Sequence, residues 1–169
     1  FVFTTPIMVW TMALDFLATF FYGATSLLPI VADKVLHTSA VGYGWLVAAT
    51  GIGALVGSFY TSLFPMPRRQ GIIFLVSVAA CGVFTIVYGV SRNYWLTFAA
   101  LAGVGLADLV STVIRQTLRQ LVTPDALRGR MTSVNMIFFM GGPQLGEFEA
   151  GLVAAFFGIT ASVVSGGVA

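Results

Sequence analysis

The sequence predicts an all-α integral membrane protein with five complete membrane spans and the beginning of a sixth. Of its 169 residues, 58% are hydrophobic and 8% are charged, whereas about 25% of residues are charged in an ordinary soluble domain. The hydrophobic residues also fall in runs of about 20, the length that an α-helix needs to cross a bilayer. Because so few charges cannot cover a solvated surface, we expect the outer surface to contact the lipid bilayer. The net charge of +2 gives no indication of a nucleic-acid partner.

The first three hydrophobic runs form one expected triplet of spans, from about residue 7 to residue 90. The first run is interrupted by Asp15 alone, and the second contains no charge. Pro65 and Pro67 end the second run, because proline cannot continue the backbone hydrogen bonds of a helix. The expected bounds of the three spans are about 7–31, 41–64 and 72–90.

The last three runs form a second expected triplet, from about residue 94 to residue 169. Their expected bounds are 94 to beyond 114, 131–157, and 159 onward. Before the fifth run, Thr123 and Pro124 are typical of a helix start, and the short helix that they begin is expected to end at Arg128 to Arg130.

The two ends of the sequence indicate a segment of a longer polypeptide. The chain begins at Phe1 rather than at a methionine. The sixth run reaches only Ala169, and its residues rise about 16 Å as a helix, roughly half of the hydrocarbon core. We therefore expect residues 1–169 to be one transmembrane half-domain with a truncated last span.

The basic residues predict how the spans are oriented. If the spans alternate, six of the basic residues lie on one side, and Lys34 and Arg92 lie on the other. Short cytoplasmic loops carry the excess of lysine and arginine. The larger group and the start of the segment are therefore expected on the cytoplasmic side of the membrane. We expect a multi-pass protein of the inner or plasma membrane. The six are Arg68, Arg69, Arg115, Arg119, Arg128 and Arg130.

Two aspartates at the centres of predicted spans are the main candidate functional residues. An ionised carboxylate at this depth costs a few kcal/mol and normally faces a bundle interior or a water-filled cavity. Asp15 shares a helix face with Thr11, Thr19, Tyr22 and Ser26. Asp108 shares a helix face with Ser111, Thr112, Arg115 and Arg119.

Asp108 is a candidate proton carrier. Burial disfavours its charged form and a nearby arginine favours it, so that this acid is expected to take up and release protons. The alternative for each aspartate is a purely structural bond that clamps two helices.

Glu147 and Glu149 are candidate cavity residues in the fifth span. They lie two residues apart and therefore point about 200° from each other on a helix. Glu147 aligns with Gln144 and Gly151, and Glu149 aligns with Asn135, Gly142 and Gly146. At this stage either glutamate could face a cavity or extend to the outer interface.

Glycine pairs indicate close helix packing. Gly53 and Gly57 form a small-xxx-small pair, and Gly142 to Gly146 encloses Pro143. The sharper interpretation of both is a bending point for alternating access. The chain holds one histidine and lacks the hydrolase, metalloprotease and phosphate-loop motifs, so that no enzyme activity, metal or cofactor is expected.

Several segments resemble exporters of the major facilitator superfamily, in the branch that contains enterobactin exporters. Segments within residues 14–44 resemble the seventh span of that branch, and those within residues 115–131 resemble its loop between spans ten and eleven. The segments are Leu14 to Phe21, Leu28 to Ile30, Gly42 to Gly44, Arg115 to Leu118, Thr123 to Asp125, Leu127 to Met131, Pro143 to Glu147, Ala150 to Gly151 and Ser165 to Gly167.

The resemblance implies spans seven to twelve of a twelve-span transporter, with Asp15 and Asp108 on helices that line the central cavity. It implies a missing N-terminal half of six helices as partner. The glycine–aspartate–arginine loop of the superfamily would follow Gly57, but only Arg68 and Arg69 remain there without an acid between them, so the resemblance does not carry over the charge relay of that loop.

Two functions are consistent with these observations. The first is proton-coupled efflux of a small amphipathic or siderophore-like molecule, driven by a proton gradient and working by alternating access. In this case Asp15 and Asp108 carry the proton or contact the substrate, and Arg115 tunes Asp108. The second is a non-transporting membrane protein that self-assembles or binds a partner chain.

Overall fold

The computed structural model describes residues 13, 16, 23–63, 70–123 and 128–168 and contains only helices and their connections in these ranges. The elements are η1 (Gly23–Leu27), α2 (Leu28–Lys34), α3 (Ala40–Leu63), α4 (Gln70–Val90), α5 (Tyr94–Val122), α6 (Arg128–Phe157) and α7 (Ile159–Val168). The all-α prediction is therefore confirmed. The observed starts of α3, α4, α5 and α6 lie within three residues of the predicted starts of the second to fifth spans.

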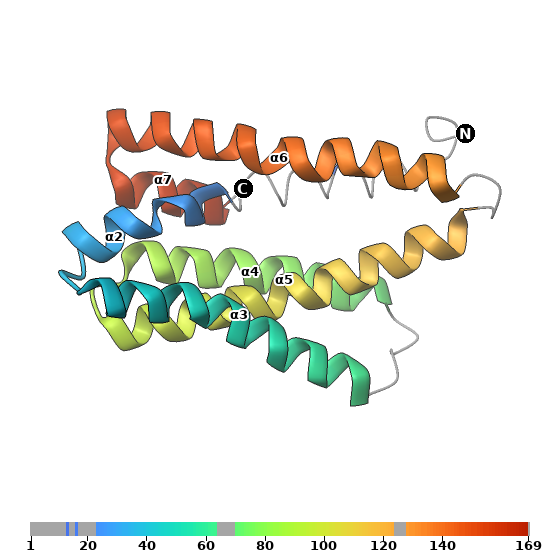
Figure 1. The fold of residues 1–169 in the computed structure, drawn as a ribbon, viewed down its shortest axis with the longest axis horizontal. Coiled ribbons are helices and arrows are strands. Elements are labelled where there is room, and N and C mark those ends of the chain that lie inside the picture. Colours follow the sequence, from blue (N-terminus) through green and yellow to red (C-terminus); the bar gives the residue numbers. More distant parts are fainter. Residues whose placement is uncertain (1–12, 14–15, 17–22, 64–69, 124–127, 169) are drawn as a thin grey trace.

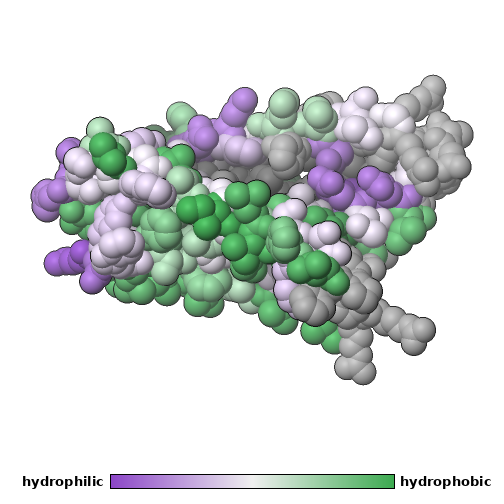
Figure 2. All heavy atoms as spheres, turned by 60° about the horizontal axis from the view of Figure 1, so that its bottom comes forward, coloured by the Kyte–Doolittle hydropathy of each residue, from purple (hydrophilic) through white to green (hydrophobic). Residues whose placement is uncertain are grey.

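Helices α3, α4 and α5 are each long and apolar enough to cross a membrane. Helix α6 has a similar length, about 45 Å at 1.5 Å per residue, but is not among these three, and it contains Gln144, Glu147 and Glu149. Figure 2 shows hydrophobic residues over most of the face in view, with hydrophilic residues gathered at one end and in a second patch toward the other end. This surface is suited to contact with lipid, except at the two hydrophilic patches.

Two predicted helix ends were wrong. The expected short helix does not end at Arg128 to Arg130, because these residues form the first turn of α6. Thr123, which the sequence suggested as a helix start, lies at the end of α5. Its hydroxyl and its backbone N–H both donate to the carbonyl oxygen of Arg119, at 2.6 and 3.0 Å. The predicted end of the first span at residue 31 was also early, since α2 continues to Lys34.

Helix α5 is the central element of the described bundle (Figure 1). It packs against α3 and α4, and α4 also packs against α7. Helix α6 lies at the edge of the bundle and packs against η1 and α7. The chain starts α5 sharply because the side chain of Asn93 caps it and accepts from the backbone N–H groups of Trp95 and Leu96, as expected of an N-cap asparagine.

Glycines allow α3 and α5 to approach each other closely. A Cβ atom added to Gly53 of α3 would lie 1.8 Å from the carbonyl oxygen of Ala102, and one added to Gly105 of α5 would lie 2.0 Å from that of Thr50. Backbone contact of this kind is typical of small residues in membrane helix interfaces. The packing interpretation of Gly53 therefore fits the structure.

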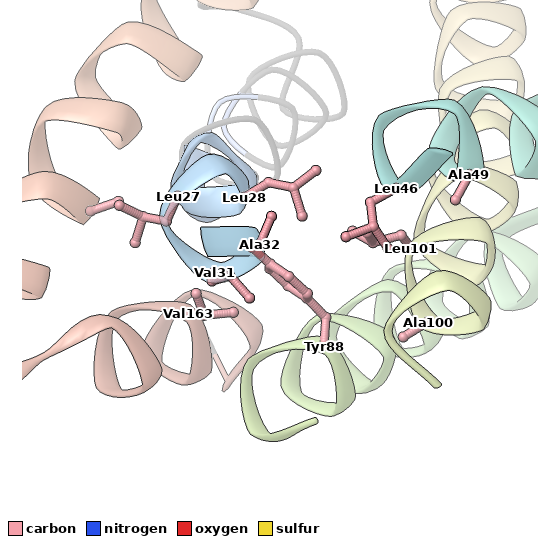
Figure 3. Packing of buried hydrophobic residues seen from close by; sticks show 11 residues of the cluster. Leu27, Leu28, Val31, Ala32, Leu46, Ala49, Tyr88, Ala100, Leu101 and Val163 are labelled. Atoms are coloured by element: carbon pink, nitrogen blue, oxygen red, sulfur yellow. The ribbon is translucent and has the colours of Figure 1, made fainter. Parts of the chain in front are cut away.

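The apolar core joins elements that are far apart in the sequence (Figure 3). Tyr88 of α4 points toward Ala32 and Val31 of α2, and Val163 of α7 lies beside Val31. Leu46 of α3 and Leu101 of α5 are completely buried nearby. This cluster holds the end of α2 against three other helices.

Candidate functional site

The polar face of α5 forms the first part of the candidate site. The sequence placed five polar residues on one helix face, and the structure buries three of them almost completely: Ser111, Arg115 and Arg119. Asp108 and Thr112 are partly exposed on the same face. Charged groups are rarely buried inside a membrane bundle without a function or a specific partner, so this face differs from the apolar remainder of α5.

The side chain of Arg115 contacts two other residues of this face, Asp108 and Thr112. Its Nη2 atom lies 3.8 Å from Oδ1 of Asp108 and donates a hydrogen bond of 3.0 Å to Oγ1 of Thr112. The separation from Asp108 is that of an ion pair rather than of a direct hydrogen bond. The side chain of Arg115 is 3% exposed, whereas that of Asp108 is 48% exposed. The guanidinium is therefore buried inside the bundle, whereas the carboxylate lies on the exposed side of α5.

Arg119 joins this face to α6. Its Nη1 atom donates to Oδ1 of Asn135, although the backbones of α5 and α6 have few other close approaches among the described residues. Helical spacing predicts that Asn135 shares a face of α6 with Glu149 but indicates no role for it. Helical periodicity contains no signal for this pair, because the two residues lie 16 positions apart on separate helices.

The two glutamates of α6 occupy different environments. Glu147 is exposed, together with Gln144 and Gly151 of its predicted face. Glu149 is half-buried, and of the other members of its predicted face Gly142 and Gly146 are buried and Asn135 is half-buried. The two predicted alignments thus correspond to an open side and a packed side of α6.

Other predicted site residues cannot be placed. Asp15, Thr19, Tyr22, Arg68 and Arg69 lie outside the described residues. The backbones of Arg128 and Arg130 lie in the first turn of α6, and their side chains are outside the described part.

The described arrangement has one clear chemical capability. A half-exposed carboxylate beside a fixed guanidinium can gain or lose a proton, and its attraction to the arginine changes when it does. Within the described ranges, no group of three or more His, Cys, Asp or Glu side chains is placed to hold a metal ion.

Comparisons with known proteins give the chain a family. Residues 5–169 match the family described as transmembrane secretion effector, within the major facilitator superfamily. The chain is 28% identical over 167 residues to the enterobactin exporter EntS of Citrobacter koseri, covering 98% of this chain and 40% of that protein. It is 26% identical to the enterobactin exporters EntS of Escherichia coli O1:K1 and of Shigella boydii serotype 18, with 99% of this chain and 40% of each relative covered. The chain therefore spans about two fifths of the length of these relatives. No solved structure matches it.

Proposed function

Because the chain belongs to the transmembrane secretion effector family of the major facilitator superfamily, we propose that it is the C-terminal half of a proton-coupled exporter. The transported molecule is small and amphipathic or siderophore-like, as the names of the related enterobactin exporters suggest. The other half of the transporter corresponds to the part of these relatives that the chain does not cover. In this proposal the basic ends of α5 and α6 face the cytoplasm.

The observation that carries this proposal is the pair of Asp108 and Arg115. Protonation of Asp108 removes its charge and weakens its attraction to the guanidinium 3.8 Å away, while Arg115 keeps its hydrogen bond to Thr112. Loss of the proton restores the attraction. Proton binding thereby changes the electrostatic environment on the open side of α5, and a transporter can couple such a change to movement of its two halves.

The proposal includes two related triplets of spans, about residues 7–90 and 94–169. The packing of the described helices supports it. In chain order, η1 of the first triplet corresponds to α5 of the second, α3 to α6, and α4 to α7. The contact of α3 with α5 then corresponds to that of α6 with η1, and the contact of α4 with α5 corresponds to that of α7 with η1. The contact of α4 with α7 maps onto itself. Inverted triplets of this kind surround a midplane site in many secondary transporters.

The test is efflux driven by a pH gradient in membrane vesicles that contain the native polypeptide. Asp108→Asn should abolish uphill efflux of enterobactin but leave assembly in the membrane unchanged. Asp33→Asn is the matched control, because Asp33 is an exposed acid at the end of α2 and should tolerate the same change. Full uphill efflux by the Asp108→Asn variant would contradict a role of Asp108 in proton coupling.

An intact-mass measurement tests the half-transporter assignment separately. Since the chain covers 40% of its relatives, the native polypeptide should exceed twice the 17.9 kDa of this chain. A native mass near 17.9 kDa would instead favour a non-transporting protein that self-assembles or binds a partner.

A further inference from the structure

Two exposed tryptophans lie near the starts of α3 and α5. Trp45 is 57% exposed in the second turn of α3, and Trp95 is 75% exposed in the first turn of α5. The indole of Trp95 packs edge-on against the rings of Tyr94 and Phe98, with ring centroids 5.6 and 6.3 Å away. Tryptophan is enriched at the boundary between hydrocarbon and water, because its ring is largely apolar and its N–H group is polar. Both positions are therefore candidates for contact with lipid headgroups.

The packing of α3 against α5 places the two tryptophans at a similar level. Both helices begin at the same end of the bundle (Figure 1). Close contacts between them pair a residue of α3 with a residue 49 to 55 positions later in α5. The same offsets place Trp45 beside residues 94–100 of α5, within about 8 Å of Trp95 along the helix axis. The contacts are those of Gly42 with Tyr94, Thr50 with Gly105, Gly53 with Ala102 and Gly57 with Leu106.

Three helices agree on the distance from this level to the opposite side of the membrane. Trp45 lies 18 residues before Leu63, the last residue of α3, which is about 27 Å along the axis. Helix α4 has 21 residues and is about 30 Å long. In α5, Arg115 is the first basic residue and lies 20 residues after Trp95, again about 30 Å. Each length matches the hydrocarbon core of a bilayer, which is about 30 Å thick.

We propose that Trp45 and Trp95 bind the lipid headgroup layer on the side of the membrane opposite the basic ends of α5 and α6, and that this contact sets the depth of the bundle. The partner is the glycerol and carbonyl region of the lipids, whose oxygen atoms accept hydrogen bonds from the indole N–H groups. Arg92, which is exposed three residues before Trp95, adds a cation suited to lipid phosphate groups. The proposed function makes this the outer side, but the lipid contact itself does not depend on transport.

This depth places Asp108 away from the midplane of the membrane. Asp108 lies 13 residues after Trp95, about 20 Å along α5, and seven residues before Arg115, about 10 Å from the opposite boundary. The acid therefore lies in the half of the membrane nearer the basic end of α5. The guanidinium of Arg115 reaches back toward Asp108, as helix side chains lean toward the N-terminus. It contributes its charge to the bundle rather than to the headgroup layer.

The experiment measures membrane depth by the quenching of tryptophan fluorescence in the native polypeptide, reconstituted in phosphatidylcholine vesicles. Each variant keeps one tryptophan, Trp45 or Trp95, and all others, including Trp10, are replaced by phenylalanine. The lipid carries bromine atoms either on the part of the acyl chain near the headgroup or near the chain end. The shallow bromines should quench both tryptophans at least about twofold more strongly than the deep bromines, because an indole at the interface lies closer to them.

The Leu106→Trp variant in a tryptophan-free background is the control for depth. Leu106 is 37% exposed and lies 11 residues after Trp95 on the same face of α5, about 17 Å deeper, so the deep bromines should quench its replacement more strongly. Stronger quenching of Trp45 or Trp95 by the deep bromines would overturn the proposal, because that indole would lie in the hydrocarbon interior. Weak quenching of either by both lipids would also overturn it, since that indole would be covered by protein.

A second set of variants tests whether the two tryptophans set the depth of the bundle. Trp45→Leu and Trp95→Leu together remove both polar ring groups, and should shift the ratio of deep to shallow quenching of the Leu106→Trp reporter by at least about 1.5-fold. Trp45→Tyr and Trp95→Tyr together keep amphipathic rings and should leave that ratio unchanged. An equal ratio in the leucine and tyrosine variants would contradict anchoring by these side chains. None of these readouts involves transport, so the outcome is independent of proton-coupled export.

Discussion

Arg115 and Asp108 form an ion pair across two turns of α5 in which only one partner is buried. The guanidinium Nη2 atom and the carboxylate Oδ1 atom lie 3.8 Å apart, with side chains 3% and 48% exposed. A buried arginine depends on its neighbours for compensation of its charge, whereas the charge of a half-exposed aspartate is also open to solvation from outside the bundle. The pair therefore keeps a fixed positive charge inside the bundle and a titratable group at its open side.

Removing one member of this pair should have unequal consequences for stability and transport. Asp108→Asn is expected to lower the melting temperature in detergent, because Arg115 loses a compensating charge. The double variant Asp108→Asn with Arg115→Met should recover much of that loss, as seen when buried ion pairs are replaced by apolar side chains, but should remain inactive in coupled efflux. A double variant as active as the wild type would show that the pair is only structural.

The contact between α5 and α6 at their basic ends should depend on Asn135. Asn135→Leu removes an acceptor of the guanidinium of Arg119, a residue that is 9% exposed, and should cost about 1–3 kcal/mol because a buried charged donor loses one of its partners. Thermal unfolding in detergent measures this loss. Ser133→Leu, at an exposed position of the same helix, is the control and should have little effect. Equal melting temperatures of the two variants would argue against the interhelical bond.

The close approach of α3 and α5 should be sensitive to one glycine and not to its neighbour. Gly53→Val places a side chain where the carbonyl oxygen of Ala102 lies and should destabilise the bundle by about 1–3 kcal/mol or more through overpacking. Gly51→Val is the matched control on the same helix, since a Cβ atom at Gly51 meets nothing within 4 Å. The folded yield after purification and the melting temperature measure the difference. A tolerated Gly53→Val would mean that the two helices can separate without loss of stability.

Two tyrosines should respond in opposite directions to the same substitution. The hydroxyl of Tyr88 is completely buried and has no hydrogen-bond partner among the residues that the structure describes. Tyr88→Phe should therefore raise the melting temperature, because an unsatisfied polar group is removed. Tyr94 donates a hydrogen bond of 3.0 Å to the carbonyl oxygen of Gly42, so Tyr94→Phe should cost about 1 kcal/mol. A destabilising Tyr88→Phe would indicate that this hydroxyl has a partner outside the described residues.

The helices and their faces could be predicted from the sequence because both depend on residues that are near one another along the chain. A run of about 20 apolar residues is long enough to span a bilayer whatever surrounds it, and helical spacing alone placed Asp108, Thr112 and Arg115 on one face. The same local reasoning failed at Arg128 to Arg130, where the short helix that Thr123 and Pro124 were predicted to begin was expected to end. A glycine inside a helix costs only about 1 kcal/mol, and α6 continues through Gly129 and packs against η1 and α7.

The amino-acid sequence by itself determined that this is an all-helical membrane protein, where its second to fifth spans begin, and which polar residues of α5 share a helix face. Tertiary structure alone decided that Arg119 meets Asn135, that Gly53 contacts Ala102, and that Glu147 is exposed where Glu149 is half-buried. The physical reason is that contacts between helices depend on which faces pack together. That choice minimises free energy over the whole bundle, whereas helix periodicity reports only on the relative directions of side chains within one helix.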